Sequence, residues 1–508
     1  MAIRIERDGP ERSRRDRNND GGGGNFLLKM LPFILFFFFK RPKLGLALLL
    51  ILGAAYYFSD GFDGMLSVDE NTSTLFSTGA DYDEVKYDRT LVFPALASNH
   101  KNNFPSQVSL LQYAPQRRNQ GRQGSCVGWA SAYAAHSILY AQATGENPER
   151  VAFSPAFLYN QIALSGCQGA YLSDALKSMS EVGSLPFQSF LYDETSCEAT
   201  PSYSQKSQAS AFKILGYNRL SQGGYNYEVD IEGIRQNIAQ GAPVVIGMQV
   251  GGSFMTQMYG QSDWRPTSSD RKLRGFSGHA MAVIGYDDNR NGGSFQVMNS
   301  WGESWGDNGV FWIRYSDFEY FVKEAYGLSP MKIRQEDANK LAVKFGIIDK
   351  VSRQNIPLRR IKSNVYRTQI AKEQRFKLEV TNATACHIYI LTEEIDGSTT
   401  VLFPYEKYSP YCGVVGTRLF PEGQSLYPDE DGNLDRFAIL VAKSEIDINQ
   451  LNRQIKNSRA NGFREKVMAA IGTQHIRDIS FKDGMETIDF EGDLNGRNVA
   501  SIIIEVSK

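Results

Sequence analysis

The sequence contains little cysteine and carries almost no net charge. Five cysteines occur among 508 residues, at positions 126, 167, 197, 386 and 412. That number is far too small for a disulfide-built scaffold, but it allows two bridges and leaves one thiol over. The formal net charge is -1, which gives no global attraction for nucleic acid. We therefore expect no nucleic-acid partner.

The chain also lacks a long uninterrupted apolar run. Leu31 to Phe39 and Leu44 to Phe58 are separated by the basic cluster Lys40 to Lys43. A single helix through both runs would place three cations in hydrocarbon, at about 2.5–3.5 kcal/mol each. We therefore predict a membrane anchor at 26–58 whose span is about 44–58. Because this span reaches only about 22 Å of a core of ~30 Å, it requires local thinning or snorkelling of flanking lysine.

The basic residues before the span set its orientation. Residues 1–25 are rich in arginine, glycine and other polar residues, so we expect a disordered tail. The positive-inside rule places this tail in the cytoplasm and exports everything after the span, to the periplasm or the cell exterior. Two alternatives stay open. Both runs could form a short hairpin that leaves the rest cytoplasmic, or cleavage after Gly53-Ala54-Ala55 could release the chain.

The length predicts two or three folded units, because one domain usually has about 100–200 residues. Residues 59–103 are rich in Ser, Asp and Asn, which predicts a linker. Residues 104–330 alternate helical and strand patterns, as in an α+β domain. The expected helix covers 126–143, and the expected strands cover 243–250, 278–286, 294–299 and 309–315.

The last part of the chain, about 345–508, predicts a mostly β module with one helix near 446–471. Its expected strands cover 375–381, 387–392, 437–442 and 499–506. Through the segment Leu402-Phe403-Pro404 the module weakly resembles a β-rich accessory domain of bacterial envelope proteins. The position of the module, not this resemblance, is the basis for expecting an envelope partner.

Three short segments carry chemically capable residues. Asn119 to Cys126 precedes a helical stretch, which places the Cys126 thiol at a helix N-terminus. The helix dipole there favours a thiolate. His279 begins an apolar strand, and Asn299-Ser300-Trp301-Gly302 follows the next strand. A buried inert cysteine or a core histidine would explain either residue alone, but not the whole pattern.

Together these motifs resemble the papain family of cysteine peptidases over about 104–325. The order of Gln120, Gly-Ser-Cys before a helix, Gly-His on a strand and Asn-Ser-Trp-Gly is that of the family. Gly166-Cys167-Gln168-Gly169 is similar to its loop beside the substrate cleft. The resemblance implies a two-lobed peptidase domain with a helical lobe and a β-barrel-like lobe, followed here by the β module.

The roles implied by this resemblance agree with the chemistry of acyl transfer. Cys126 is implied to be the nucleophile and His279 its base, because a thiol reacts as the thiolate. Asn299 is implied to fix the imidazole tautomer, and Gln120 to donate to the oxyanion. We also expect a thiolate–imidazolium pair that reacts well below the ordinary thiol pKa of about 8.5. The implied substrate-binding residues are Gly169, Ala170, Gly278 and Trp301.

The sequence departs from the family at the nucleophile loop. Gln123 stands where relatives usually have a cysteine three residues before the nucleophile, so Cys167 needs another partner. Cys197 is the nearest candidate, and Cys386 and Cys412 form a second candidate pair. About 45 residues lie between the anchor and the start of the domain. These are too few for the helical inhibitory propeptide of plant and animal relatives.

The sequence therefore predicts a membrane-anchored enzyme that hydrolyses peptide or protein substrates through an acyl-enzyme on Cys126. It predicts no metal and no cofactor. An acyltransferase or amidase on the same fold would use the same four residues and remains an alternative. A non-catalytic binding module with this fold is the third possibility, and the four intact positions count against it.

Overall fold

The structure is a computed structural model of the full chain. It describes residues 3–7, 76–92, 94, 96–97, 104–222, 228–331, 339–405, 408–413, 415–422, 424–484 and 486–508. The expected anchor at 26–58 and the first part of the expected linker lie outside the described residues. Among the described residues, no helix has both the length and the apolar character needed to cross a membrane.

The first domain is built around a buried helix that begins at Cys126. It runs through α4 (Cys126–Gly128), η3 (Trp129–His136) and α5 (Ser137–Thr144). Gly145 ends it with a left-handed φ of 72°, a conformation that glycine adopts without a steric penalty. The predicted helix is confirmed. Further helices of this domain are α6 (Pro155–Ile162), α7 (Leu172–Glu181), α8 (Tyr203–Ala209), α9 (Ile231–Ala239), α10 (Ser253–Thr256) and α11 (Tyr315–Phe321).

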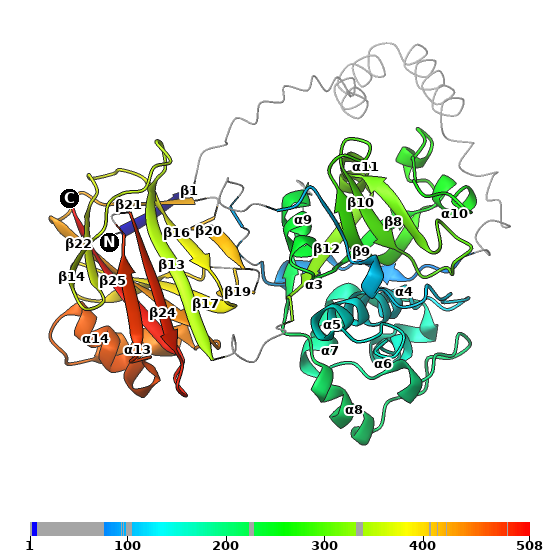
Figure 1. The fold of residues 1–508 in the computed structure, drawn as a ribbon, viewed down its shortest axis with the longest axis horizontal. Helices are drawn as coiled ribbons and strands as arrows, with labels where there is room; N and C mark the ends of the chain where they lie inside the picture. Colours follow the sequence, from blue (N-terminus) through cyan, green and yellow to red (C-terminus); the bar gives the residue numbers. More distant parts are fainter. Residues whose placement is uncertain are drawn as a thin grey trace, which may run out of the picture. The chain divides into compact units, whose positions relative to one another are not determined.

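A seven-stranded sheet forms the other part of this domain within the described residues (Figure 1). Its strand order is β11-β10-β9-β8-β12-β5, with β3 also paired to β9. The strands are β3 (Gln107–Ser109), β5 (Tyr217–Arg219), β8 (Val244–Val250), β9 (Ser277–Asp287), β10 (Ser294–Met298), β11 (Val310–Arg314) and β12 (Val322–Leu328). All four predicted strands are present. The short pairs are β2 (Ala80–Asp81) with β4 (Ala170–Tyr171), and β6 (Ser221–Gln222) with β7 (Glu228–Val229).

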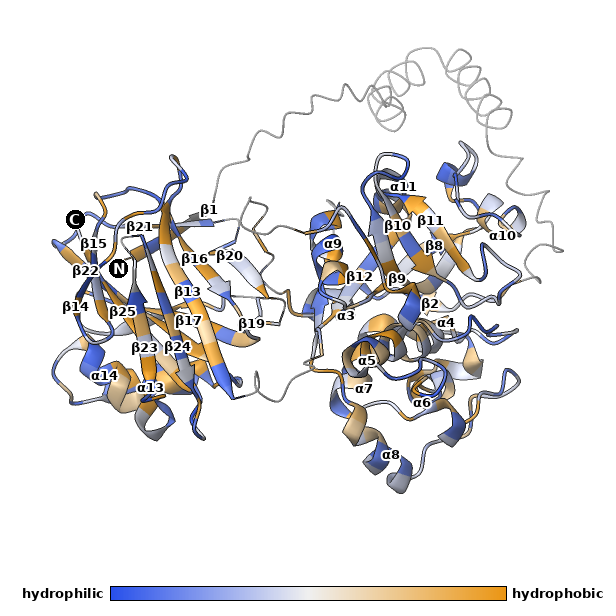
Figure 2. Ribbon diagram, viewed as in Figure 1, coloured by the Kyte–Doolittle hydropathy of each residue, from blue (hydrophilic) through white to orange (hydrophobic). Residues whose placement is uncertain are grey.

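The described residues from 339 onward, together with β1 (Ile3–Arg7), form two more sheets, each of seven strands. One has the order β1-β21-β16-β13-β24-β23 with β20 beside β16, and the other β14-β15-β25-β22-β17-β18 with β19 beside β17. Both contribute to one apolar core, and hydrophobic residues line β13 and β17 in Figure 2. The strands are β13 (Lys340–Asp349), β14 (Arg359–Lys362), β15 (Val365–Gln369), β16 (Phe376–Asn382), β17 (Cys386–Glu393), β18 (Thr399–Phe403), β19 (Tyr411–Cys412), β20 (Gly416–Phe420), β21 (Gln424–Pro428), β22 (Leu434–Ala442), β23 (Ile479–Asp483), β24 (Thr487–Asp493) and β25 (Val499–Ser507).

The single helix predicted near 446–471 is wrong, because the chain forms two helices there. They are α13 (Ile448–Asn457) and α14 (Phe463–Ile471). Gly462 lies between them with a φ of 94°, which is incompatible with a continuous right-handed helix. Apolar residues of both helices pack in a second core with residues of β17 and β22. The helices therefore cover one face of that sheet.

The expectation of a disordered tail at 1–25 is wrong for residues 3–7. These form β1 (Ile3–Arg7), which pairs antiparallel with β21 in the register Ile3 with Pro428 and Ile5 with Leu426. Ile3 is 1% exposed in the core, and Arg4 lies 3.8 Å from the Asp429 carboxylate. The alternation of isoleucine with charged residues suits an edge strand with one buried face.

The linker predicted at 59–103 is likewise wrong for residues 76–91. Residues 84–89 form helix α3 (Glu84–Arg89), whose N-cap Asp83 accepts hydrogen bonds from the backbone of Val85 and Lys86. Tyr87 on this helix is 1% exposed, and its hydroxyl hydrogen-bonds to Ser221 at 2.6 Å. This part of the chain is therefore folded against the first domain instead of serving as a spacer.

Candidate active site

Cys126 lies at the first turn of the central helix and faces strand β9. Its thiol sulfur accepts a hydrogen bond from the backbone N–H of Ala280 at 3.4 Å. The side chain is fully buried, with 0% exposure. The helix dipole is aligned to favour a negative charge at this position, while burial opposes it.

His279 lies on β9, and Asn299 directly follows the neighbouring antiparallel strand β10. The Nε2 atom of His279 lies 2.7 Å from Asn299 Oδ1, and the same oxygen accepts from the backbone N–H of Ser300 at 2.7 Å. An amide oxygen only accepts, so Nε2 carries the hydrogen. Within the described part of the chain, Nδ1 is buried without a hydrogen-bond partner. The tautomer therefore leaves Nδ1 as the basic nitrogen.

The side-chain amide of Gln120 is held by hydrogen bonds at both its oxygen and its nitrogen. Its Oε1 accepts from the Ser300 hydroxyl at 2.7 Å, which fixes the orientation of the amide. Its Nε2 donates to the backbone carbonyls of Gln123 at 3.0 Å and of Ser77 at 3.1 Å. One of these two hydrogen bonds thus stays within the nucleophile loop, and the other reaches Ser77, far earlier in the chain.

Trp301 forms the middle of a stack of rings above the histidine. Its ring lies 4.4 Å from the His279 ring and 4.5 Å from that of Phe76, measured between centroids, with small interplanar angles. Its indole N–H donates to the carbonyl of Ser77 at 3.1 Å. The tryptophan, 1% exposed, shields the hydrogen bond between His279 and Asn299 from water.

The segment Phe76–Asp81 occupies the position predicted for substrate. Gly79 donates its N–H to the carbonyl of Gly278 at 3.2 Å, and its carbonyl accepts from the N–H of Ala170 at 2.9 Å. A Cβ on Gly169 would lie 2.9 Å from the same carbonyl. All four residues predicted to bind substrate therefore contact this segment.

The segment runs against the direction that a substrate needs. A leaving amine takes its proton from His279, so the C-terminal half of a substrate must lie on the side of His279 and Trp301. The segment instead places its N-terminal residue Phe76 on Trp301 and its C-terminal residues 80–81 in parallel pairing with residues 170–171. We call residues 76–81 the plug. The structure therefore shows a closed form of the domain, in which the plug fills the cleft but is not positioned for cleavage.

Burial sets the protonation of the catalytic pair in this closed form. Desolvation raises the pKa of the Cys126 thiol to about 12 and lowers the pKa of His279 to about 4, and the hydrogen bond to Asn299 only partly offsets the second shift. Both shifts favour the neutral thiol and the neutral imidazole. The predicted thiolate–imidazolium pair is therefore disfavoured while the plug is bound.

The other four cysteines form one disulfide and one pair of free thiols. Cys167 and Cys197 form a disulfide, as the sequence predicted. Cys386 and Cys412 face each other on antiparallel strands but are free thiols, so the second predicted bridge is absent. A hydrogen bond from the Cys386 thiol is the main cause that lowers the pKa of Cys412.

Sequence reasoning missed two contributors to the site. Ser300 orients Gln120 through its hydroxyl, and its position directly after Asn299 was a signal that could have identified it. The plug was missed because its residues were read as part of a linker. A Cβ on Gly79 would lie 2.2 Å from the carbonyl oxygen of Gly124, so only glycine fits, but this constraint exists only in the tertiary fold and left no signal in the sequence.

A thiol at a helix start, an imidazole on the adjacent strand and an amide that fixes its tautomer define a cysteine peptidase. Comparison with known proteins identifies the family. The model described as papain family cysteine protease matches residues 107–326. This part of the chain is a cysteine peptidase domain of that family.

Known relatives are similar to this part of the chain. An uncharacterized peptidase C1-like protein of Acanthamoeba polyphaga mimivirus is 29% identical over 219 residues, which are 41% of this chain and 67% of that protein. Cysteine proteinase 3 of Entamoeba histolytica is 26% identical over 273 residues, 50% of this chain and 80% of the relative. The crystal structure of xylellain, a cysteine protease from Xylella fastidiosa, aligns with a TM-score of 0.41 at 23% identity, over 51% of this chain and 97% of xylellain.

Proposed function

We propose that the chain hydrolyses peptide bonds through a thioester on Cys126 once the plug has left the cleft. The observation that carries the proposal is the fixed tautomer of His279, whose Nε2–H is bound to Asn299 at 2.7 Å. This leaves Nδ1 as the base, and Nδ1 has no competing hydrogen bond within the described residues. A thiol needs such a base to react at neutral pH.

The reaction follows from these atoms. The thiol proton moves to His279 Nδ1, and the sulfur forms a bond to the substrate carbonyl carbon, whose oxygen becomes negative. Gln120 Nε2, released from the Ser77 carbonyl, donates to that oxyanion together with the Cys126 N–H. When the tetrahedral intermediate collapses, the C–N bond breaks and the amine takes the proton from Nδ1. Water then attacks the thioester with His279 as base, and the acid product leaves the regenerated thiol.

The test compares full-length wild type, Cys126→Ala, Gly79→Val and the double variant on a fluorogenic peptide library. Gly79→Val cannot keep the plug in place, because its Cβ would overlap the Gly124 carbonyl. We expect it to hydrolyse peptides faster than wild type, and we expect the double variant to be inactive. Equal activity with and without Cys126 would reject the proposal.

Acyl transfer to an amine by the same residues is distinguished in the same assay. Adding an amine nucleophile and analysing the products by mass spectrometry would give mainly acid for a hydrolase. It would give mainly the new amide for a transferase. An active-site fold that binds peptide without turnover would give neither product.

We also propose that residues 26–58 attach the enzyme to a membrane. The support is their apolar sequence, with the basic cluster at 40–43. The pairing of residues 3–7 with 424–428 favours the hairpin topology over the single span, because one crossing would separate these two strands. An envelope partner for the C-terminal module would then have to lie on that same side of the membrane.

The topology is tested by cross-linking in intact cells. Arg4 and Tyr427 are register partners in the β1–β21 pair, so Arg4→Cys with Tyr427→Cys should form a disulfide under mild oxidation. Arg4→Cys with Gln424→Cys, three positions along the strand, serves as the control. A cross-link in membrane-bound protein supports the hairpin. If only detergent-extracted protein cross-links, the single span is the correct topology.

A further inference from the structure

The loop that carries Gln120 and Cys126 lacks the disulfide expected from its relatives, because Gln123 replaces the cysteine. The loop is also shaped unusually, with Gly121 at a φ of 66°. Both catalytic positions must be held to a fraction of an ångström for the oxyanion to form its hydrogen bonds. Other contacts must therefore supply the rigidity.

Residues 192–197 provide these contacts, and we call them the bracket. The Tyr192 hydroxyl lies 2.7 Å from the Gln120 carbonyl and 2.6 Å from the Ser125 hydroxyl. Since the carbonyl only accepts, Tyr192 donates to it and the Ser125 hydroxyl donates to Tyr192. One hydroxyl thus joins the two ends of the loop, directly beside the oxyanion donor and the nucleophile.

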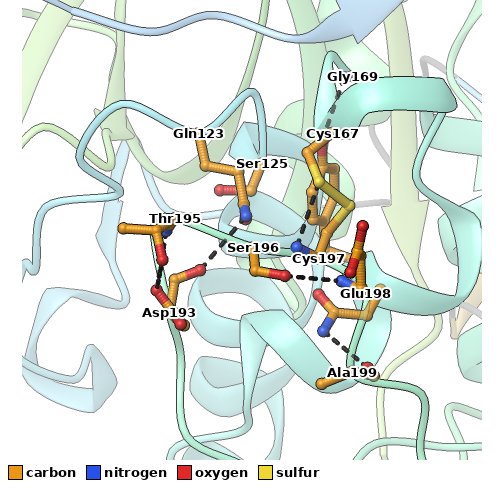
Figure 3. The surroundings of a disulfide bond; sticks show 12 residues. Gln123, Ser125, Cys167, Gly169, Asp193, Thr195, Ser196, Cys197, Glu198 and Ala199 are labelled. Atoms are coloured by element: carbon orange, nitrogen blue, oxygen red, sulfur yellow. Dashed lines mark hydrogen bonds between the residues drawn. A yellow bond between two sulfur atoms is a disulfide. The ribbon is translucent and has the colours of Figure 1, made fainter.

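Two further contacts continue along the bracket. Gln123 Nε2 donates to the carbonyl of Asp193 at 3.3 Å, as Figure 3 shows. The Arg122 N–H donates to the Glu194 carboxylate at 3.0 Å. That carboxylate lies so close to Gly121 that a Cβ there would be 1.3 Å from Oε2. The bracket therefore follows the whole loop.

The far end of the bracket is tied to the substrate cleft. Cys197 is bonded to Cys167 (Figure 3), which lies two residues before Gly169. The loops also touch directly, since a Cβ on Gly124 would be 3.1 Å from both the Cys167 carbonyl and the Gly169 N–H. The bracket thus connects the nucleophile loop to the cleft loop without a cysteine at position 123.

We propose that the bracket holds the loop 120–126 in the geometry that the oxyanion requires, with Tyr192 as its main positioning residue. The inference rests on the function proposed above. Tyr192 is suited to this role because its ring packs against Trp129 at 4.9 Å between centroids. Burial also raises the pKa of its hydroxyl, so the hydroxyl keeps its proton and remains a donor at neutral pH.

The experiment replaces Tyr192 by phenylalanine, which keeps the ring and removes the hydroxyl. Hydrogen exchange of the full-length chain should show roughly ten-fold faster exchange at the amides of residues 121–125. In the full-length Gly79→Val background, kcat should fall about ten-fold with KM within two-fold, since small misplacements can cost up to about 10²-fold. Alkylation of Cys126 by iodoacetamide should not change, because activation of the sulfur depends on His279.

The matched control is Tyr140→Phe, whose ring packs against Phe153 and Phe212 in the same domain. It should leave exchange, kcat and alkylation unchanged. A merely structural role of Tyr192 would lower the melting temperature and change KM and alkylation together. Unchanged exchange and kcat in Tyr192→Phe would overturn the proposal.

The experiment remains decisive if the variant does not fold or if the chain shows no activity. If Tyr192→Phe does not fold, Glu194→Gln weakens the contact with the Arg122 N–H instead, and unchanged exchange at residues 121–123 would reject the bracket. If the wild-type and Gly79→Val chains hydrolyse no peptide, the proposed function fails. Exchange in the loop still decides whether the bracket holds it.

Discussion

The peptidase domain and the C-terminal module both bury polar side chains, and one cluster in each region serves a different purpose. In the module, the fully buried Lys508 ammonium contacts the carboxylates of Asp429 at 2.7 Å and Asp435 at 2.9 Å. In the peptidase domain, His279 Nδ1 and Asn299 Nδ2 are buried without partners in the described part of the chain. Buried polar groups are normally satisfied. Among the described residues, unpartnered buried atoms also occur in the module, at Asn355 Nδ2 and His387 Nδ1, so the peptidase domain differs in that one of its unpartnered nitrogens belongs to the proposed catalytic histidine.

The largest expected difference between the two regions concerns their buried thiols. Cys126→Ala should lower the rate of peptide hydrolysis by roughly 10⁴-fold or more, because no other group can form the acyl-enzyme. Cys386→Ala should leave the rate per folded molecule unchanged. Steady-state assays of both variants in the Gly79→Val background test this. Loss of activity in Cys386→Ala would contradict the assignment of chemistry to one region only.

The next effect is on stability and is confined to the module. Lys508→Met removes the cation that both buried carboxylates contact, although Arg4 stays 3.8 Å from Asp429, and it should cost about 3–5 kcal/mol in the free energy of unfolding. The control is Lys340→Met, because Lys340 forms an exposed ion pair with Glu491 at 3.5 Å and should cost less than about 1 kcal/mol. Urea unfolding of both variants measures the difference. Equal costs would show that the buried triad is not a stabilising feature.

The pH dependence of closure gives a third test. The pKa of His279 falls from its ordinary 6.5 to about 4 in the closed form. The closed form therefore prefers the neutral imidazole of His279. This preference stabilises closure fully above pH 6.5, and the stabilisation is lost as the pH falls towards 4. Acid should therefore favour release of the plug by roughly 10²-fold. Amide exchange at Gly79 and Ala170, corrected for the intrinsic effect of pH, measures the release.

The control for the pH effect is His279→Gln, which removes the titrating group. Its plug should be released to a similar extent at pH 4.5 and pH 7. A pH dependence that persists in this variant would assign the effect to another group. The raised pKa of Cys126 acts in the opposite direction, since closure should weaken again once the pH exceeds the thiol pKa of the open form.

The smallest expected effect is that of Cys386→Ala on stability. The variant removes one buried sulfur and the hydrogen bond between Cys386 and Cys412. A loss of about 1 kcal/mol is typical of such a change. Urea unfolding beside Lys508→Met would rank the two. A cost larger than that of Lys508→Met would mean that the thiol pair, not the ion triad, secures the module.

Sequence patterns predicted the elements whose contacts are local or periodic. The periodicity of the sequence predicted the central helix and four of the seven described strands of the peptidase sheet. The spacing of the motifs predicted the site formed by Gln120, Cys126, His279 and Asn299. The break before α14 was missed, although Gly462 marks it. Strand β1 was also missed, because arginine content outweighed the period-two alternation of Ile3 and Ile5.

The plug and the bracket could not be predicted for a different reason. The contacts of Ser77 and Gly79 are made largely by backbone atoms, and those of Tyr192 involve the carbonyl of Gln120. Backbone donors and acceptors are the same in every residue, so such contacts leave little trace in the side-chain pattern. Only the tertiary fold brings these groups together.

The position of β1 at the edge of its sheet also constrains how the chain is made. Residues 3–7 are synthesised before their partners at 424–428, which follow about 417 residues later. At about 5–20 residues per second, the ribosome needs roughly 20–80 s to produce them. The pair of β1 and β21 can form only after the intervening chain has been made. A truncated chain that lacks its first eight residues would keep this edge open to other strands, which is a typical route to aggregation.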